Sequence, residues 1–323
     1  MRRLPSELLM LLVMGCAAPY ATMAVNVPVT DLRTAPRTSA AAGAHDPMEE
    51  TQLLYGEQVR VLKTEEGWAQ IQAVEQPEFT HAKRWQGYPG WVPATALTTP
   101  DPFWAPTMVV TEKWASAWED SYRLRPSSWR FPLGTRLRAV DMGGQIWKVE
   151  LLDGQTVWLA RQAGRSFEEL RARSASDTRQ AIVRAAALFI GDAYYWGGRS
   201  PANSRRPQDA EVTGVDCSGL VNLAYRAAGM DVPRDAHEQF LRASPITALQ
   251  PADLVFLSER DHPGRIVHVM LYAGRGELIE GPGTGAAVRR IAFSNRLGRP
   301  EDALAPGAVV DGQTVSFGSF FPH

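Results

Sequence analysis

The sequence has few cysteines, no long apolar run and no excess of positive charge. Only two of the 323 residues are cysteine, Cys16 and Cys217, which excludes a disulfide framework and a cysteine-rich zinc site. The longest apolar run, residues 8–14, is too short for a membrane-spanning helix, which needs about 20 residues. The 34 lysines and arginines balance the 35 aspartates and glutamates, so a nucleic-acid partner is not expected. The six histidines show no HExxH or related spacing, and we expect neither a metal nor a cofactor.

Tryptophan is abundant but unevenly distributed. Nine of the ten tryptophans lie between Trp68 and Trp158. A chain of this length is expected to form two or three domains at roughly 100–200 residues each. The asymmetry therefore indicates two different kinds of domain.

Residues 25–162 have the pattern of short strands and turns. Apolar residues alternate over residues 58–62 and 147–151, and glycine-rich turns separate such runs. Residues 56–62 (GEQVRVL) are echoed 78 positions later by residues 134–140 (GTRLRAV). The repeat predicts two small all-β barrels, over residues 25–99 and 103–162, followed by a polar linker over residues 163–176.

Residues 177–323 have a different pattern, which predicts an α+β domain. Helical periodicity follows Asp177 and again Cys217, and each run ends at a glycine. Strand patterns then appear at residues 253–257, 266–272 and 277–280. Residues 286–323 are expected to complete the sheet. Two helices followed by several strands are typical of α+β domains.

The first 24 residues have the layout of an export signal. Two arginines precede the apolar run, and small residues follow it. Two cleavage sites compete: residues 13–16 (VMGC) resemble a bacterial lipobox, which would make Cys16 a lipid attachment site, and cleavage after Ala24 would release the protein. We favour the lipobox. The sequence thus predicts an exported protein of the periplasm or cell envelope, attached to a membrane only through a lipid anchor.

Three residues form a candidate catalytic set. Cys217 lies in residues 214–220 (GVDCSGL), where a turn leads into a predicted helix whose positive end favours the thiolate. Fifty-one residues later His268 lies in a predicted strand, and Glu280 ends the next strand. Antiparallel pairing of these strands would bring His268 and Glu280 together. A lone cysteine is more often a small buried hydrophobe, but a Cys–His pair with a third orienting group is the arrangement of a cysteine peptidase.

Further motifs accompany this set. They are AYYWGG (residues 193–198), DCSGL (216–220), PRD (233–235), ADLVF (252–256) and HVMLYAG (268–274). With them the C-terminal half resembles the NlpC family of cell-wall cysteine peptidases, and residues 25–162 resemble bacterial SH3-like domains. The resemblance implies a papain-like α+β catalytic domain preceded by two small all-β SH3-like barrels.

The resemblance also implies roles for individual residues. Cys217 would be the nucleophile, His268 the general base and Glu280 the third member of the triad. Tyr194 matches the tyrosine that helps to position the tetrahedral intermediate. The family often has His, Asn or Gln at the position of Glu280, and a carboxylate can orient an imidazole equally well.

Two SH3-like units before such a domain resemble the γ-D-glutamyl-L-diamino acid endopeptidases of the dipeptidyl-peptidase VI type. Members of this group cut peptidoglycan stem peptides that have a free N-terminal L-Ala, between D-Glu and the diamino acid. The implied partners are therefore peptidoglycan-derived peptides. The substrate-binding residues expected from the resemblance are Asp216 and Ser218, which would hold the free amine, Arg234 and Asp235 of the PRD motif, and Glu50 and Tyr88 from the first SH3-like unit.

Two alternatives share these motifs. An amidase or acyltransferase would use the same triad and differ only in its product. A wall-binding adaptor with an inactive catalytic domain would keep the fold without turnover. The sequence does not indicate an oligomeric state. It also does not distinguish diaminopimelate from lysine at the cleaved bond.

Overall fold

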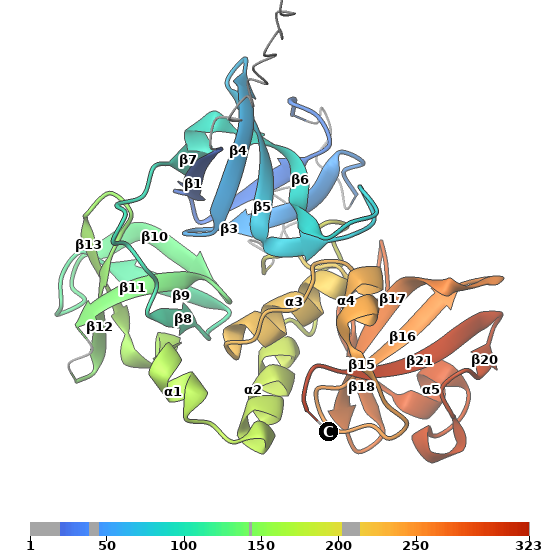
Figure 1. Cartoon of the computed structure of the whole chain (residues 1–323). Coiled ribbons are helices and arrows are strands. Elements are labelled where there is room, and N and C mark those ends of the chain that lie inside the picture. Colours follow the sequence, from blue (N-terminus) through green and yellow to red (C-terminus); the bar gives the residue numbers. More distant parts are fainter. Residues whose placement is uncertain (1–19, 39–44, 142–143, 202–213, 323) are drawn as a thin grey trace, which may run out of the picture.

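The computed structural model describes residues 20–38, 45–141, 144–201 and 214–322. It consists of two all-β units and a C-terminal unit of helices and sheet, which confirms the predicted fold class (Figure 1). Helix α3 (Cys217–Ala227) lies in the middle, close to both all-β units. Cys16 lies outside the described residues, so its lipidation stays a prediction.

The first all-β unit is a seven-stranded sheet in the order β3-β2-β6-β5-β4-β1-β7. Its strands are β1 (Ala21–Val25), β2 (Val29–Arg33), β3 (Glu49–Leu54), β4 (Gln58–Glu65), β5 (Trp68–Glu78), β6 (Gln86–Pro93) and β7 (Leu97–Thr98), with a short 3-10 helix η1 (Ala94–Ala96) before β7. Alternating residues such as Val59, Ile71 and Val92 form its core. The predicted run at residues 58–62 lies in β4, between β5 and β1, and contributes Val59 to this core.

Strand β1 corrects the expected start of this unit. The sequence assigns residues 1–24 to the signal, but residues 21–25 pair with β4 and β7. Ala24 and Val25 are buried in the first two units' cores. Thr22, Met23 and Ala24, which suggested a cleavage site after Ala24, are strand residues, and cleavage there would remove most of this strand from the sheet.

The second all-β unit repeats the first. Its strand order, β10-β9-β13-β12-β11-β8-β14, is the order of the first sheet with every number raised by seven, which confirms the internal repeat. Its strands are β8 (Met108–Val110), β9 (Trp114–Trp118), β10 (Pro126–Pro132), β11 (Arg136–Asp141), β12 (Ile146–Glu150), β13 (Thr156–Ala160) and β14 (Gly164–Ser166).

Residues 163–176 are not the open linker that their polar composition suggested. They follow the 3-10 helix η2 (Arg161–Ala163) and contain β14, helix α1 (Phe167–Arg171) and the start of α2 (Ala175–Ala187). The physical reason is a capping box: Ser166 accepts from the backbone N–H of Glu169, and Glu169 accepts from that of Ser166.

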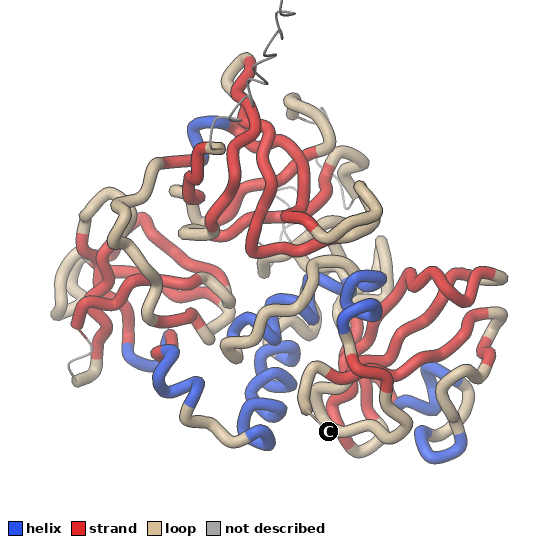
Figure 2. Tube along the Cα trace, viewed as in Figure 1, coloured by secondary structure: helices blue, strands red, loops and turns tan. Residues whose placement is uncertain are grey.

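The C-terminal unit is a sheet with helices on both faces (Figure 2). Its sheet has the order β15-β21-β16-β17-β18-β19, with β20 paired to β21, so the chain's last residues do complete it. Besides α2 and α3, the elements are α4 (Ala236–Arg242), β15 (Ser244–Pro245), β16 (Leu254–Glu259), β17 (His262–Gly274), β18 (Glu277–Glu280), β19 (Arg289–Ala292), α5 (Phe293–Leu297), the 3-10 helix η3 (Glu301–Ala303), β20 (Val309–Val310) and β21 (Gln313–Ser319). One core joins α2 and α3 to the sheet, and a second joins α5 to its other face. No helix among the described residues is long and apolar enough to span a membrane.

Candidate active site

Cys217 is the first residue of α3 and lies at the point where the helix meets the first all-β unit and the edge of the sheet. Asp216 caps the helix by accepting from the backbone N–H of Gly219 at 2.6 Å. Every residue of α3 is buried, so the helix that presents the thiol is held on all sides. The helix dipole places the partial positive charge of its N-terminus at the Cys217 sulfur, which favours the thiolate.

His268 and Glu280 lie together on neighbouring strands, as predicted. Nε2 of His268 is 2.8 Å from Oε2 of Glu280, and the Cys217 thiol is hydrogen-bonded to the same imidazole ring. Burial alone lowers the pKa of His268, but hydrogen bonds and charge interactions with Cys217 and Glu280 raise it to about 9. Burial alone raises the pKa of Glu280, but His268 and two arginines lower it to about 2. The three side chains therefore form one connected chain of hydrogen bonds.

Tyr194 lies beside Cys217. Its backbone bridges to Val215, just before the helix, and its side chain lines the same pocket as the thiol. Burial and the neighbouring Cys217 and Asp216 raise the pKa of the phenol. The hydroxyl therefore stays protonated at neutral pH and can donate a hydrogen bond.

A pocket of about 690 Å³ opens at Cys217 and is shared between two units. One wall is formed by the starts of α3 and α4 and by residues 264–267 at the beginning of β17. The other wall is formed by residues of the first all-β unit, which are Glu50, Thr80, His81, Lys83 and Tyr88. The loop between β5 and β6 is fastened to α4, because Glu238 accepts from the backbone N–H of Thr80 at 3.0 Å and from its hydroxyl at 2.5 Å. The first all-β unit is thus a fixed part of the pocket.

Two carboxylates converge at the end of this pocket. The hydroxyl of Tyr88 is 3.0 Å from Oδ2 of Asp235 and 3.3 Å from Oε2 of Glu50. Asp235 is 36% exposed, so a ligand can reach it. Burial, against the opposing effect of Arg234, raises the pKa of Asp235 to about 7, and burial also raises the pKa of Glu50. His81, which sequence reasoning missed, lies 3.8 Å from Glu50 and edge-on to the Tyr88 ring.

Asp216 lines the pocket and is joined to Arg234, so its predicted role in substrate binding stays a prediction. Arg234 is fully buried and binds both oxygens of Asp216, at 2.7 and 3.0 Å. Asp216 also accepts from Ser218, Gly219 and the backbone N–H of Gly197, so its lone pairs are occupied. Arg234 further donates to Thr51 of β3 at 2.6 Å. This pair braces the start of α3 against the first all-β unit, and the pocket-lining carboxylates more exposed than Asp216 are Asp235 and Glu50.

Ser218 shares this arrangement. Its hydroxyl accepts from Arg234 at 3.0 Å and donates to Asp216 at 3.2 Å, but the residue also lines the pocket. It therefore lies between the bracing pair and the ligand space.

Two family models match this chain. Residues 191–299 match the NlpC/P60 family, and residues 32–76 match the bacterial dipeptidyl-peptidase SH3 domain. The NlpC/P60 match includes Cys217, His268 and Glu280, and the SH3 match includes Glu50 of the opposite wall.

Several curated proteins are similar to this chain. A γ-D-glutamyl-L-lysine dipeptidyl-peptidase of Bacillus cereus is 28% identical over 254 residues, which is 76% of this chain and 71% of that protein. The protein of the same name from Bacillus subtilis is 27% identical, and the alignment covers 78% of each chain. The murein DD-endopeptidase MepH of Escherichia coli is 39% identical over 110 residues, 32% of this chain and 36% of that protein.

Solved structures share the whole architecture. An NlpC/P60 family protein from Bacillus cereus has a TM-score of 0.71 at 22% identity, covering 94% of this chain and 100% of that one. An NlpC/P60 endopeptidase from Photobacterium damselae has a TM-score of 0.57 at 14% identity, covering 92% of this chain and 72% of that one. At these identities the likeness establishes the fold.

Proposed function

Because the chain carries an NlpC/P60 domain behind a bacterial dipeptidyl-peptidase SH3 domain, we propose that it is a cysteine peptidase acting on peptidoglycan stem peptides. The bond cleaved is the one between the γ-carboxyl of D-Glu and the following diamino acid, in peptides whose N-terminal L-Ala is free. The names of the two Bacillus relatives support this bond.

One observation carries the proposal: the pocket at Cys217 ends at two carboxylates, one from each unit. Glu50 comes from β3 and Asp235 from the start of α4, and both contact the Tyr88 hydroxyl. An ammonium group has three donors, so a free N-terminal amine would satisfy the two carboxylates and the phenol oxygen together. The wall built by the first all-β unit limits the substrate beyond this amine, which excludes a peptide still joined to a glycan strand.

The proposed reaction passes through a thioester. The Cys217 thiolate attacks the γ-carbonyl carbon of D-Glu, and the imidazolium of His268 gives its proton to the departing amine of the diamino acid. A water molecule then attacks the thioester while His268 accepts its proton. Release of L-Ala-D-Glu with a free γ-carboxylate restores the thiolate–imidazolium pair.

The oxyanion formed in each step requires donors. The backbone N–H of Cys217 at the start of α3 is one, and the Tyr194 hydroxyl, which is neutral in this environment, is the other. Glu280 would orient His268 so that Nδ1 faces the thiol, since Nε2 is engaged by the carboxylate.

The proposed substrate places the protein in the cell envelope. Peptidoglycan peptides occur outside the cytoplasmic membrane or next to it, which agrees with the export signal expected at the start of the sequence. Lipidation of Cys16 would hold the enzyme at a membrane surface while leaving the three units free in the aqueous phase.

The experiment that tests the proposal uses the tripeptide L-Ala-γ-D-Glu-meso-diaminopimelate. We expect the full chain to release the diamino acid and Cys217→Ala to release none, with both measured by chromatography of the products. Cys217→Ser is the matched variant that keeps a hydroxyl and tests the need for sulfur. Intact tripeptide after incubation with the wild type, or equal hydrolysis by Cys217→Ala, would contradict the proposal.

A further inference from the structure

Glu280 has more partners than orientation of one histidine requires. Its side chain is fully buried, and besides His268 it receives two arginines. Arg289 donates from Nε at 3.0 Å and from Nη2 at 2.6 Å, and Arg296 donates from Nε at 3.1 Å. Four hydrogen bonds from three cationic groups thus end on one carboxylate.

The two oxygens of Glu280 have different partners. Oε1 is occupied by Arg289 alone, through both donors. Oε2 is shared between His268 and Arg296. Arg289 therefore fixes the rotation of the carboxylate. Arg296 competes with His268 for the negative charge on Oε2.

The arginines come from two elements of the fold. Arg289 is paired directly with Glu280 in the β18–β19 ladder. Arg296 lies on α5, which is anchored by the buried side chains of Phe293 and Leu297. Both arginines therefore reach Glu280 from rigid positions, although Arg289 is 47% exposed and Arg296 23% exposed at their outer edges.

We propose that Arg289 and Arg296 are positioning residues of the Cys217–His268–Glu280 set: Arg289 locks the carboxylate in the rotamer that accepts from His268, and Arg296 limits how strongly that carboxylate holds the imidazolium proton. The expected effect on kcat rests on the proposed peptidase function, whereas the expected effect on the alkylation of Cys217 does not.

The electrostatics of the pair support these roles. The charged or titratable groups that face His268 and Glu280 are Cys217 from α3, Arg289 from β19 and Arg296 from α5, with Tyr194 beside the thiol. Burial favours the neutral form of Glu280, and interactions with His268, Arg289 and Arg296 oppose it and keep the carboxylate charged. The two guanidinium groups share the negative charge of this carboxylate with His268.

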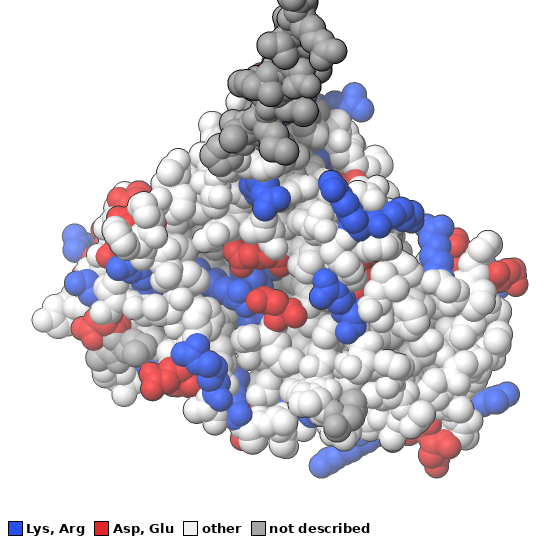
Figure 3. Space-filling view, viewed as in Figure 1, with Lys and Arg blue, Asp and Glu red and all other residues white. Residues whose placement is uncertain are grey.

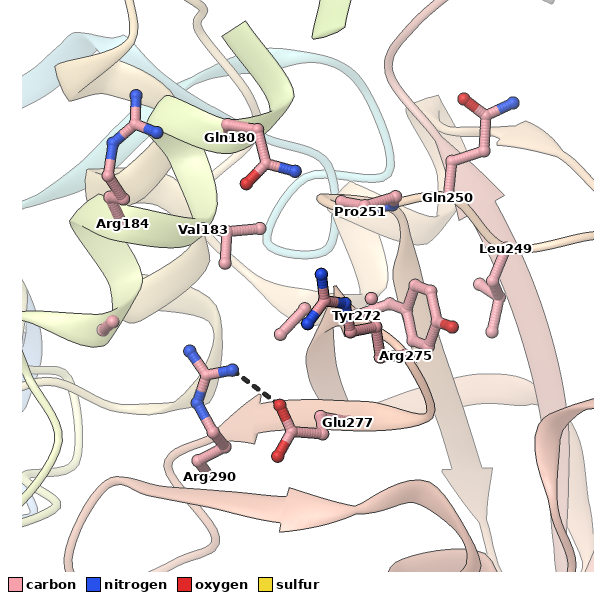
Figure 4. Close-up of a pocket in the computed structure, with 13 residues that line it drawn as sticks. Gln180, Val183, Arg184, Leu249, Gln250, Pro251, Tyr272, Arg275, Glu277 and Arg290 are labelled. Carbon is pink, nitrogen blue, oxygen red and sulfur yellow. Dashed lines mark hydrogen bonds and ion pairs between the residues drawn. The ribbon is translucent and has the colours of Figure 1, made fainter. Parts of the chain in front are cut away.

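The test compares Arg289→Met and Arg296→Met with a matched control on the same strand. Arg290 follows Arg289 and pairs with another carboxylate of β18, Glu277, at 2.8 Å. That pair lines a separate hollow of about 510 Å³ at the other end of β17 (Figure 4). Arg290→Met removes a more exposed ion pair between the same two strands without touching Glu280.

Two readouts are measured on the full chain. The first is the rate at which iodoacetamide alkylates Cys217 as a function of pH, which reports the two protonation steps of the Cys217–His268 pair and needs no peptide substrate. The second is the hydrolysis of the tripeptide.

In Arg296→Met we expect both inflections of the alkylation profile to move to higher pH, because a cation next to the pair is lost. In Arg289→Met we expect kcat to fall about ten-fold or more with KM unchanged, since the carboxylate can rotate away. Arg289→Lys should recover part of this loss, and Arg290→Met should match the wild type in both measurements.

The inference is overturned if both variants keep the wild-type alkylation profile and kcat while the wild type cleaves the tripeptide. If the wild type leaves the tripeptide intact but the inflections shift as expected, the positioning role stands and the proposed function fails. Thermal unfolding of each variant identifies a fold defect. If Arg289→Met does not fold, the alkylation profile of Arg296→Met alone decides whether the inference holds.

Discussion

At the scale of single residues, the most exposed acid in the pocket is Asp235. The sequence motif DCSGL drew attention to Asp216, but its charge is neutralised by Arg234, which lies 18 residues further along the chain. Asp235 has only a 3.6 Å contact with the same guanidinium and a phenol as partners. Its carboxylate is thus the one whose ionisation would govern the binding of an ammonium group.

The pKa of Asp235 leads to a pH dependence with a definite sign. Because burial raises the pKa of this carboxyl to about 7, it is neutral at lower pH and no longer attracts the substrate amine. We expect kcat/KM for the free tripeptide to fall as the pH falls through about 7. The inflection should lie at lower pH in kcat, because the bound ammonium keeps the carboxylate ionised.

Asp235→Asn should remove this inflection and lower kcat/KM by about ten- to a hundred-fold at pH 8. This is the effect expected from the loss of one hydrogen bond between charged groups, which contributes about 1.5–3 kcal/mol. Glu277→Gln, which lies in the hollow of Figure 4, is the control. An unchanged inflection in Asp235→Asn would assign the titration to another group.

At the scale of elements, helix α3 is held at both ends. Asp216 and Arg234 brace its N-terminus. At its other end, Arg226 contacts Glu57 at 3.3 Å and Glu75 at 2.7 Å in the first all-β unit and donates to the backbone carbonyl of Gly134 in the second at 2.9 Å. The position of the Cys217 thiol therefore depends on contacts with all three units.

Arg226 is expected to contribute strongly to stability. Arg226→Met would leave the buried Glu57 with Arg199 as its remaining cationic partner, at 2.8 Å. Removing one partner of a buried ion pair costs about 3–5 kcal/mol, and we expect a loss of this size in the free energy of unfolding in urea.

Arg138→Met is the matched control, because Arg138 pairs with Glu150 at 3.1 Å in a partly exposed position of β11. Exposed pairs contribute about 0–1 kcal/mol. Equal losses in the two variants would show that the junction at the end of α3 contributes no more than a surface pair.

At the scale of the whole molecule, ion pairs join the three units to one another. Acidic and basic side chains lie side by side in the middle of the face shown in Figure 3. Arg136 of the second unit adds to such a network by pairing with Glu75 of the first at 3.6 Å and with Asp231 of the C-terminal unit at 2.7 Å. Charge pairs of this kind specify relative orientation more than they add stability.

Local patterns predicted much of this molecule. The α3 start, the β17–β18 pair and the repeat of two sheets follow from short-range periodicity and turn spacing, so Cys217, His268 and Glu280 could be placed together. Arg289 could have been found in the same way, since it lies opposite Glu280 across the next turn.

Other features depend on distant contacts that no local pattern encodes. The saturation of Asp216 by Arg234 requires the chain to fold back after α3, and His81 of the β5–β6 loop meets Glu50 of β3 only in the folded sheet. Strand β1 was missed because small residues suit a signal cleavage site and a packed strand equally well.

The most direct test of the account is the ratio of kcat/KM for L-Ala-γ-D-Glu-meso-diaminopimelate to that for the same peptide with an acetylated N-terminus. Acetylation removes the positive charge and leaves Glu50 and Asp235 facing an uncharged amide. The account expects a ratio of at least about a hundred. Equal values for the two peptides would contradict it.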